Sequence, residues 1–379
     1  MLQVDLTVTI ESGSVAPIGI VGVVGAGTMG SGIAQLALEA GHEVVLHDID
    51  EATIERGRSR VREGLARRAG RLELDPDSSD DWVSGRLAGL RDAHSLDAVG
   101  AEAEFVIEAA LEDLELKRTI FSTLDAVAAP GVVLATNTSA LPVAGVAQRT
   151  RHPERIIGLH FFNPAPVMPL VEVVVPPAAA EHVVERAVRL MEAWGKTPVR
   201  CADTPGFIVN RINRPFTIEA LRMLEAGVAS VEEIDDAVRG GGFPMGPFEL
   251  MDLVGLDVNL ATALGVWELL GRPQRLRPSP IQEAMVADGR LGQKTGAGFY
   301  RYVDGRRRGV AEASEPVSSA GLDAGVIRDR ILVAIEVEAR EAVAQGVATR
   351  EDIDLAMRAG AGHPVGPFER ARRSQSGRE

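Results

Sequence analysis

One stretch near the N-terminus constrains the fold more than any other: "IGIVGVVGAGTMGSGIAQLALEAGHEVVLHDID", residues 18–50. Its apolar, β-branched start predicts a buried strand, and the segment after "GAGTMG" has the pattern of a helix that ends at Gly41. A second short strand over Val44–Leu46 is closed by Asp48. G-x-G-x-x-G alone is a weak signal in a chain with 40 glycines. Between a strand and a helix, with an acid closing the next strand, it indicates a dinucleotide-binding unit.

Each glycine of this loop has an expected task. Gly25 permits the tight turn, Gly27 lets a pyrophosphate approach the backbone, and Gly30 lets the helix pack on the strand. The helix N-terminus would face the phosphates, with Thr28 and Met29 completing the cofactor-binding loop. The alternative is a glycine-rich turn in an α/β protein that binds no nucleotide.

Asp48 is suited to accept hydrogen bonds from both hydroxyls of an adenosine ribose. The residues after it are Ile49 and Asp50, so no arginine is placed to hold a 2′-phosphate. This favours NAD over NADP as cofactor. Asp48 could also cap the helix that follows, and the two roles can coexist.

Further strands are expected at Phe105–Ile107, Val132–Ala135 and Ile156–Leu159, with helical patterns between them. This alternation predicts an α/β fold of the Rossmann type, a doubly wound parallel sheet. After residue 203 the pattern becomes helical, which predicts an all-α domain. A chain of 379 residues is long enough for two or three domains.

Composition excludes several classes of function. No apolar run reaches the length of a membrane span, and the first residues lack the pattern of a signal peptide. The net charge of −14 argues against nucleic acid as a partner. A single cysteine, Cys201, excludes an internal disulfide framework and fits the cytoplasm. No cluster of metal ligands is expected.

The stretch "RIIGLHFFNPAPVMPLVEVV", residues 155–174, places two polar side chains inside apolar runs. His160 and Glu172 would be costly to bury there unless each had a partner. We expect the two to pair across neighbouring strands, so that the carboxylate orients the imidazole for proton transfer. A histidine with a purely structural role is the alternative.

Five motifs in order carry a family resemblance: "GAGTMG", "TNTSAL", "GLHFFNPAPVMPLVEVV", "DTPGFIVNR" and "GPFELMDLVGLD". Together they resemble the L-3-hydroxyacyl-CoA dehydrogenase family, which includes 3-hydroxybutyryl-CoA dehydrogenases. The resemblance implies NAD-dependent oxidation of a 3-hydroxyacyl thioester to the 3-ketoacyl thioester, or the reverse. By motif, His160 would be the general base and Glu172 its partner. Ser139 and Asn210 would contact the reacting oxygen and the thioester region, although alone either residue could simply cap a turn.

The resemblance also implies further contacts. For NAD they are Glu112, Lys117, Ser139, Asn163 and Lys294, besides the loop and Asp48. The chain has only three lysines, and Lys117 and Lys294 are two of them. Arg71 matches a lysine that commonly meets coenzyme A and is therefore a substrate-binding candidate. Gly64 and Pro169 stand where other members carry Ser and Lys, which weakens free coenzyme A as the carrier.

The segment 56–71, "RGRSRVREGLARRAGR", carries seven arginines on an expected helix. A solvated helix face explains such a run, and so does a site for a phosphorylated handle or an acidic carrier protein. The same chemistry on an acyl-carrier-protein substrate, as in polyketide extender-unit biosynthesis, is therefore one alternative. A non-catalytic NAD-binding relative is another. The acidic "LELDPDSSDD" after the segment is expected to be a loop.

A repeat marks the second half, because "EEIDDAVRGGGFPMGPFE" (232–249) matches "EDIDLAMRAGAGHPVGPFE" (351–369). The expected organisation is an N-terminal extension (1–17), the NAD-binding domain (18–203) and the helical domain (204–302). A linker (303–325) and a partial second copy of the helical domain with a polar, disordered tail (326–379) would follow. A partial copy could cap the first one, or could expose an apolar face that allows a homodimer.

Overall fold

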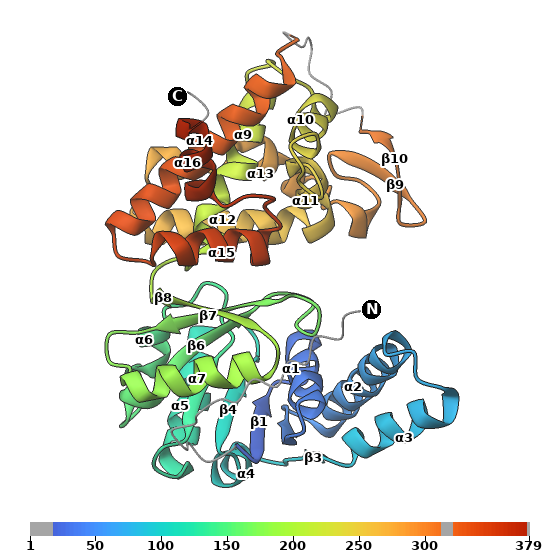
Figure 1. The fold of residues 1–379 in the computed structure, drawn as a ribbon, viewed down its shortest axis with the longest axis vertical. Coiled ribbons are helices and arrows are strands. Elements are labelled where there is room, and N and C mark those ends of the chain that lie inside the picture. Colours follow the sequence, from blue (N-terminus) through green and yellow to red (C-terminus); the bar gives the residue numbers. More distant parts are fainter. Residues whose placement is uncertain (1–17, 312–320, 377–379) are drawn as a thin grey trace.

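The computed structural model describes residues 18–311 and 321–376, so the expected N-terminal extension lies outside the described residues. Figure 1 shows a sheet domain and, stacked on it, a domain of helices. The chain passes from one to the other after residue 202. The second copy of the repeat lies among the helices of the first, on the same side of the sheet domain.

The sheet domain is built from alternating strands and helices around one eight-stranded sheet, in the order β3-β2-β1-β4-β5-β6-β7-β8. β1 to β6 run parallel to one another, which confirms the expected Rossmann-type topology. Its elements are β1 (Ile20–Val24), α1 (Thr28–Glu39), β2 (Glu43–His47), α2 (Glu51–Arg71), α3 (Pro76–Leu87), β3 (Leu90–Asp92), α4 (Leu96–Glu102), β4 (Phe105–Glu108), α5 (Leu114–Val127), β5 (Val133–Thr136), α6 (Val143–Val146), η1 (Ala147–Arg149), η2 (Pro153–Arg155), β6 (Ile156–Phe161), β7 (Leu170–Val175), α7 (Glu181–Ala193) and β8 (Thr197–Ala202).

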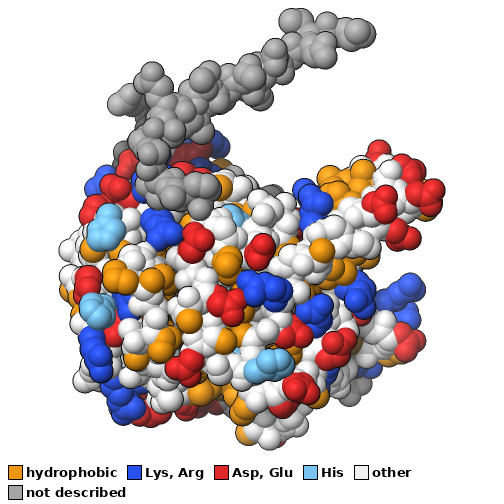
Figure 2. Space-filling model, turned by 90° about the horizontal axis from the view of Figure 1, so that it is seen from below, with side chains coloured by type: hydrophobic (Ala, Val, Ile, Leu, Met, Phe, Trp, Pro, Cys, Tyr) orange, Lys and Arg blue, Asp and Glu red, His pale blue; other side chains and the backbone are white. Residues whose placement is uncertain are grey.

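The last two strands, β7 and β8, are parallel to each other but run opposite to the other six. β7 runs antiparallel to β6, because residues 162–169 between them are too few for a crossover helix. Helices cover both faces of the sheet, with α1 and α7 packed on one side and α4, α5 and α6 on the other. On the face seen in Figure 2, basic and acidic side chains are interspersed, without a broad region of one sign.

The helical domain contains α8 (Val209–Ile212), α9 (Arg214–Glu225), α10 (Val231–Arg239), α11 (Pro247–Val254), α12 (Leu256–Leu269), η3 (Gln274–Leu276), α13 (Pro280–Ala287), η4 (Gln293–Thr295), β9 (Tyr300–Val303) and β10 (Arg306–Val310). The second copy contains α14 (Ala324–Ala344), α15 (Arg350–Ala361) and α16 (Pro367–Ser376). No single described helix is long and apolar enough to cross a membrane. α11 and α12, which meet at a bend of 102°, reach that length and apolarity only when counted together.

The two copies share a structural device as well as a sequence. Asp235 accepts hydrogen bonds from the backbone N–H groups of Phe248 and Glu249 at the start of α11. Asp354 does the same at the start of α16 in the second copy. The repeated "ID…GPFE" pattern is therefore a helix pair whose second member is capped from the first.

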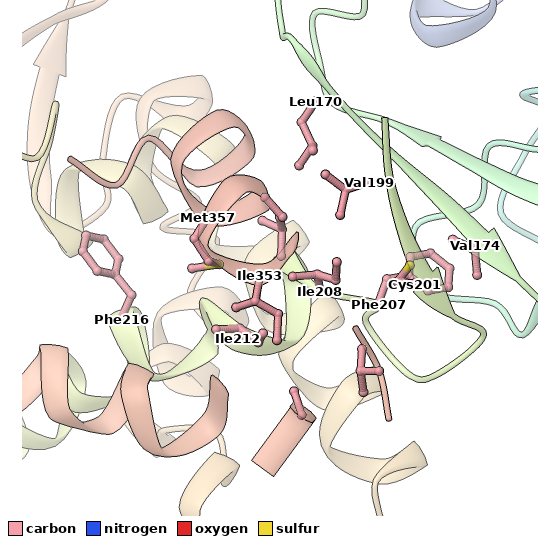
Figure 3. Close-up of a cluster of buried hydrophobic side chains, with 14 of the residues drawn as sticks. Leu170, Val174, Val199, Cys201, Phe207, Ile208, Ile212, Phe216, Ile353 and Met357 are labelled. Carbon is pink, nitrogen blue, oxygen red and sulfur yellow. The ribbon is translucent and has the colours of Figure 1, made fainter. Parts of the chain in front are cut away.

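The second copy packs against the first and also against the sheet domain. α14 lies on α9 and α10, whereas α15 contacts α8 and the last two strands of the sheet, β7 and β8. Figure 3 shows the shared apolar cluster, in which side chains of α15 lie with those of β7, β8, the turn before α8, α8 and α9: Leu170, Val174, Val199, Cys201, Phe207, Ile208, Ile212, Phe216, Ile353 and Met357.

A buried ion cluster also joins the copies. Glu338 on α14 accepts from Arg211 Nε at 2.7 Å and from Arg275 Nε at 2.6 Å. Glu338 and Arg211 are both at most 1% exposed. Removing one partner from such a cluster leaves an uncompensated buried charge, so the cluster makes docking of α14 specific.

Three expectations about the chain between elements were wrong. The acidic segment after α2 forms α3, because Asp75 caps it by accepting from Ser78 N and Pro76 occupies its first turn. The expected linker 303–325 holds β10 and the start of α14, while residues 312–320 lie outside the described part. The polar tail continues α16 as far as Ser376, beyond which residues are not described.

Candidate functional site

The glycine loop between β1 and α1 has the geometry of a phosphate-binding turn. Gly25 adopts φ +103°, and a Cβ there would lie 2.5 Å from the Ala109 carbonyl oxygen. A Cβ on Gly30 would lie 1.7 Å from the Gly25 carbonyl oxygen. A Cβ on Gly27 would meet nothing within 4 Å, so open space remains beside the N-terminus of α1. That space, with the helix N-terminus behind it, fits the pyrophosphate of NAD.

Asp48 lies directly after β2 and secures this loop. It accepts hydrogen bonds from Ala26 N and Ile49 N, both at 2.6 Å. The capping role considered for it belongs instead to Asp50, whose carboxylate accepts from Thr53 N at the start of α2. Asp48 thus stands beside the glycine loop, where an acid can meet a ribose.

A hydrogen-bonded network of acidic side chains, hydroxyl groups and one lysine lies at the ends of β4 and β5. Lys117 is 1% exposed, with Nζ 2.6 Å from Glu108 Oε1 and 3.5 Å from Glu112 Oε2. The structure therefore does not bring Lys117 to the cleft as a direct contact, and its ammonium instead supports the two glutamates. Glu108 was missed by the sequence reasoning, although an acid ending the apolar run "FVIE" was a usable signal.

Glu112 is positioned by the loop that follows β5. It accepts from Thr138 Oγ1 at 2.6 Å and from Ser139 N at 2.9 Å. Burial alone would raise the pKa of Glu112, but the Thr138 hydroxyl, the Lys117 ammonium and the backbone N–H donors outweigh it and lower the pKa. Glu112 is therefore an anion that fixes the backbone of Ser139 at the cleft.

His160 and Glu172 are cross-strand partners, which confirms the expected pairing. They face each other in the β6–β7 ladder, with His160 Nδ1 2.6 Å from Glu172 Oε2. The other oxygen, Oε1, accepts from the backbone N–H groups of Ile208 and Val209 at 3.0 and 2.8 Å. Glu172 is fully buried. Because its carboxylate can only accept from His160 Nδ1, the second nitrogen of the ring, Nε2, is left as the proton acceptor.

The His160 imidazole is flanked by two aromatic rings, one of which lies at the junction of the two domains. The rings of Phe162 and Phe207 lie 4.5 and 5.7 Å from it, centroid to centroid. Phe207 has φ +49°, a left-handed conformation held in the turn between β8 and α8. The backbone amides that follow it reach Glu172. The motif "DTPGFIVNR" was noted in the sequence, but its backbone contact with Glu172 was not foreseen.

His160 opens onto a cavity of about 590 Å³ between the two domains. Asn210 Nδ2 donates to the Ser139 carbonyl oxygen at 3.3 Å across this junction. The sheet domain, the helical domain and the second copy all contribute to the wall: Met29, Ala109, Ala110, Glu112, Asn137, Ser139, His160, Phe161, Phe162, Asn163, Val209, Asn210, Asn213, Arg214, Leu250, Val254, Val258, Asn259, Thr262, Gly360 and Ala361. The structure thus brings His160, Ser139, Asn210, Glu112 and Asn163 together at one cleft.

A second cavity of about 280 Å³ lies between α1 and α2 and has Asn163 in common with the first. Arginines of α2, among them Arg71, line it together with Thr28 of the glycine loop: Arg60, Arg67, Arg68 and Arg71. Gly64 is tightly enclosed, since a Cβ there would lie 2.0 Å from Gln35 Oε1. The helix expected for segment 56–71 is confirmed, and its basic face borders a pocket.

The loop between β6 and β7 is held by a buried lysine. Lys196 Nζ donates to the carbonyl oxygens of Ala165 and Met168 at 2.6 and 2.9 Å. Burial lowers the pKa of Lys196 to about 8, partly offset by the negative charge of Glu39. Lys196, which had no role from the sequence, therefore fixes the loop that carries Asn163.

Lys294 is not part of this constellation. Its ammonium lies 2.6 and 2.7 Å from the two carboxylate oxygens of Asp257 in the helical domain. It lines neither of the two cavities described above. Among the described residues, no three His, Cys, Asp or Glu side chains gather in a group that could hold a metal ion.

Comparison with known proteins gives a consistent picture. The NAD-binding domain of 3-hydroxyacyl-CoA dehydrogenase matches residues 20–204, and the C-terminal domain of that family matches residues 206–302 and 325–375. A 3-hydroxyadipyl-CoA dehydrogenase of Escherichia coli is 43% identical over 332 residues, covering 86% of this chain and 69% of the relative. A 3-hydroxybutyryl-CoA dehydrogenase of Mycobacterium tuberculosis is 44% identical over 288 residues, covering 74% of this chain and 98% of the relative.

Solved structures agree. A crystal structure of a 3-hydroxybutyryl-CoA dehydrogenase from Escherichia coli K12 superimposes with a TM-score of 0.85 at 34% identity, covering 94% of this chain and 92% of that one. The (S)-3-hydroxybutyryl-CoA dehydrogenase of Ralstonia eutropha gives 0.72 at 37% identity, covering 76% and 100%. With both of its domains matched in order, the chain belongs to the 3-hydroxyacyl-CoA dehydrogenase family.

Proposed function

We propose that this protein is an NAD-dependent dehydrogenase that interconverts an L-3-hydroxyacyl-CoA and the corresponding 3-ketoacyl-CoA. The observation that carries the proposal is the His160–Glu172 pair at 2.6 Å, facing a cavity that also contains Ser139 and Asn210. A secondary alcohol must lose its hydroxyl proton as hydride leaves its carbon, so a neutral imidazole at that place has a chemical purpose.

Each residue of the set would have a separate task. In oxidation, His160 Nε2 takes the proton of the 3-hydroxyl group, and in reduction it returns one. Glu172 keeps Nδ1 protonated and stabilises the positive ring that forms. Ser139 and Asn210 would hold the reacting oxygen and the thioester. Bound NAD, held by the glycine loop, Asp48, Glu112 and Asn163, would supply the hydride acceptor.

Coenzyme A is favoured as the acyl carrier over an acyl carrier protein. The relatives reported above are all named for CoA thioesters, and their acyl groups include chains with and without a terminal carboxylate. The arginine-lined cavity beside Asn163 would receive phosphate groups of the coenzyme, with Arg71 as one contact. The proposal leaves the acyl group itself open.

The test follows NADH absorbance with acetoacetyl-CoA and, separately, with acetoacetyl groups on an acyl carrier protein. We expect turnover of the CoA thioester, and a KM that rises with salt because phosphate contacts are screened. Arg71→Gln should raise that KM, whereas Arg62→Gln on the same helix, outside the cavity, should not. Turnover only of the carrier-bound substrate would replace the CoA assignment. NADH binding without turnover of either would support a non-catalytic role.

Pairing of two chains through the helical domain stays a prediction, as does a cytoplasmic location. The second copy covers parts of α9 and α10, while Val326, Val333 and Val337 on α14 are each more than half exposed. The mass of the protein in solution, measured by light scattering across concentrations, tests the dimer.

A further inference from the structure

Arg214 is a buried cation in the wall of the catalytic cavity. It begins α9, one helical turn after Asn210, and the residue is only 7% exposed. It lines the same cavity as His160. A guanidinium in such a place is costly unless something compensates its charge.

No acidic side chain among the described residues supplies that compensation. Arg214 Nε donates to the Asn210 carbonyl oxygen at 2.9 Å, and Nη1 reaches the Asn259 carbonyl oxygen at 3.3 Å. Across residues 18–311 and 321–376, Nη2 makes no hydrogen bond to the protein, yet it is not among the fully enclosed polar atoms. Burial lowers the pKa of Arg214 to about 10, so it remains positively charged at neutral pH.

A neighbouring arginine shows what a structural cation looks like in this fold. Arg211, three residues earlier, is fully buried, and its two Nη atoms have no hydrogen-bond partner among the described residues, but its Nε is paired with the Glu338 carboxylate at 2.7 Å, which compensates its charge. The chain therefore supplies an internal anion for Arg211 and leaves Arg214 facing the cavity without one. This contrast points to an anion that arrives with the ligand.

The direction of the acyl chain follows from the two cavities. Asn163 belongs both to the catalytic cavity and to the arginine-lined one, where the coenzyme phosphates are proposed to bind. With the reacting carbon at His160, the end of the acyl chain that lies away from the thioester extends toward the helical domain. That part of the wall combines apolar and polar side chains: Asn213, Arg214, Leu250, Val254, Val258, Asn259 and Thr262.

We propose that Arg214 binds a carboxylate at the distal end of the acyl chain, which makes the preferred substrate a 3-hydroxydicarboxylic acyl-CoA. The inference rests on the proposed function and names its substrate class. A carboxylate would accept the free N–H groups of the guanidinium and neutralise its charge. A plain alkyl chain of equal length would instead cover the guanidinium and remove its water without giving it a partner.

Arg214 also has a structural role, because its bonds to Asn210 and Asn259 tie α8 to α12. A loss of activity after mutation would therefore decide nothing by itself. The informative quantity is the ratio of kcat/KM for two substrates that differ only in the terminal group. 3-Hydroxyadipyl-CoA and 3-hydroxyhexanoyl-CoA are such a pair, with six carbons each and either a carboxylate or a methyl group at the end.

We expect the unmodified protein to prefer the carboxylated substrate at least about tenfold, mostly through KM. Arg214→Met should lower the ratio about 100-fold, since a charged hydrogen-bonded pair is lost for one substrate only. Arg214→Lys, which keeps the charge but not the planar fork, should give an intermediate ratio. Arg222→Met on the same helix, outside this cavity, should leave the ratio unchanged.

The outcomes separate the two proposals. Turnover of both substrates with a ratio near one in the unmodified protein would overturn the inference and leave the proposed function standing. A preference that survives Arg214→Met would overturn it as well. If Arg214→Met does not fold, judged by its melting curve, the unmodified ratio and Arg214→Lys still decide. Absence of turnover with either thioester, despite NADH binding, would overturn the proposed function itself.

Discussion

Replacing Glu172 by glutamine changes one functional group and should exchange the donor and acceptor nitrogens of the His160 imidazole. Glu172 receives three donors: His160 Nδ1 on Oε2, and the N–H groups of Ile208 and Val209 on Oε1. An amide has only one oxygen, and the two backbone N–H groups require it. The amide NH2 must then face His160 Nδ1 as a donor, so the proton of the neutral ring moves to Nε2. In that tautomer Nε2 cannot accept a proton from the substrate.

The magnitude follows from what is lost. The charged hydrogen bond and its stabilisation of the positive ring together amount to about 3 kcal/mol of activation free energy, or about 100-fold in kcat. The glycine loop and Asp48 are not touched, so the Kd for NADH should change less than about twofold.

The assay measures kcat and KM with acetoacetyl-CoA across pH, and NADH binding by fluorescence titration. Glu181→Gln, at an exposed glutamate paired with Arg200 in the same domain, is the matched control and should keep full activity. Full kcat of Glu172→Gln across pH would refute the assigned tautomer. A large loss of NADH affinity would show that the substitution disturbs more than the imidazole.

Three further predictions concern the cofactor loop and the second copy. Gly27→Ala should fold, because a Cβ at Gly27 meets only open space, but that Cβ occupies the space expected for the pyrophosphate and should weaken NAD affinity about tenfold by titration. Gly30→Ala should instead lower the melting temperature, because its Cβ clashes with the Gly25 carbonyl oxygen. Glu338→Gln should lower the urea unfolding free energy by about 3 kcal/mol. Glu336 on the same helix pairs with the half-exposed Arg340, so Glu336→Gln is a control with less than about 0.5 kcal/mol of effect. His363, whose pKa is lowered from 6.5 to about 3 by burial, resists protonation that the unfolded chain accepts. The contribution of His363 to stability should therefore fall as pH drops below 6.5, by up to about 1.4 kcal/mol per pH unit. The difference in unfolding free energy between the unmodified protein and His363→Phe, from urea melts at pH 5 and 7, measures that contribution.

The elements that the sequence predicted well are those with strong local patterns. The strand–glycine–helix unit, the parallel strands and the His160–Glu172 pair follow from apolar periodicity and from the cost of burying a lone polar group. The repeat also appeared in the sequence, and the twin caps made by Asp235 and Asp354 show that it is structural.

The failures have two physical origins. The acidic segment and the linker were predicted from their polar composition, although each contains a local signal for regular structure. Asp75-Pro76 starts α3, and Asp304-Gly305 forms the turn of a hairpin with two positive φ angles. The other failures concern long-range partners. Nothing near Lys117 or Lys294 in the sequence shows that one is enclosed by Glu108 and the other held by Asp257. The unpaired state of Arg214 likewise becomes visible only in three dimensions.

The two oxygens of Glu172 connect the catalytic imidazole directly to the helical domain. One holds the imidazole in the sheet domain, and the other holds the first backbone amides of the helical domain, directly after the turn at Phe207. A rotation of the helices about that turn must pull on the same carboxylate that aims the ring. Opening and closing of the cleft and the alignment of the proton acceptor are therefore interlocked, so the base is correctly aimed only while the two domains are seated against each other.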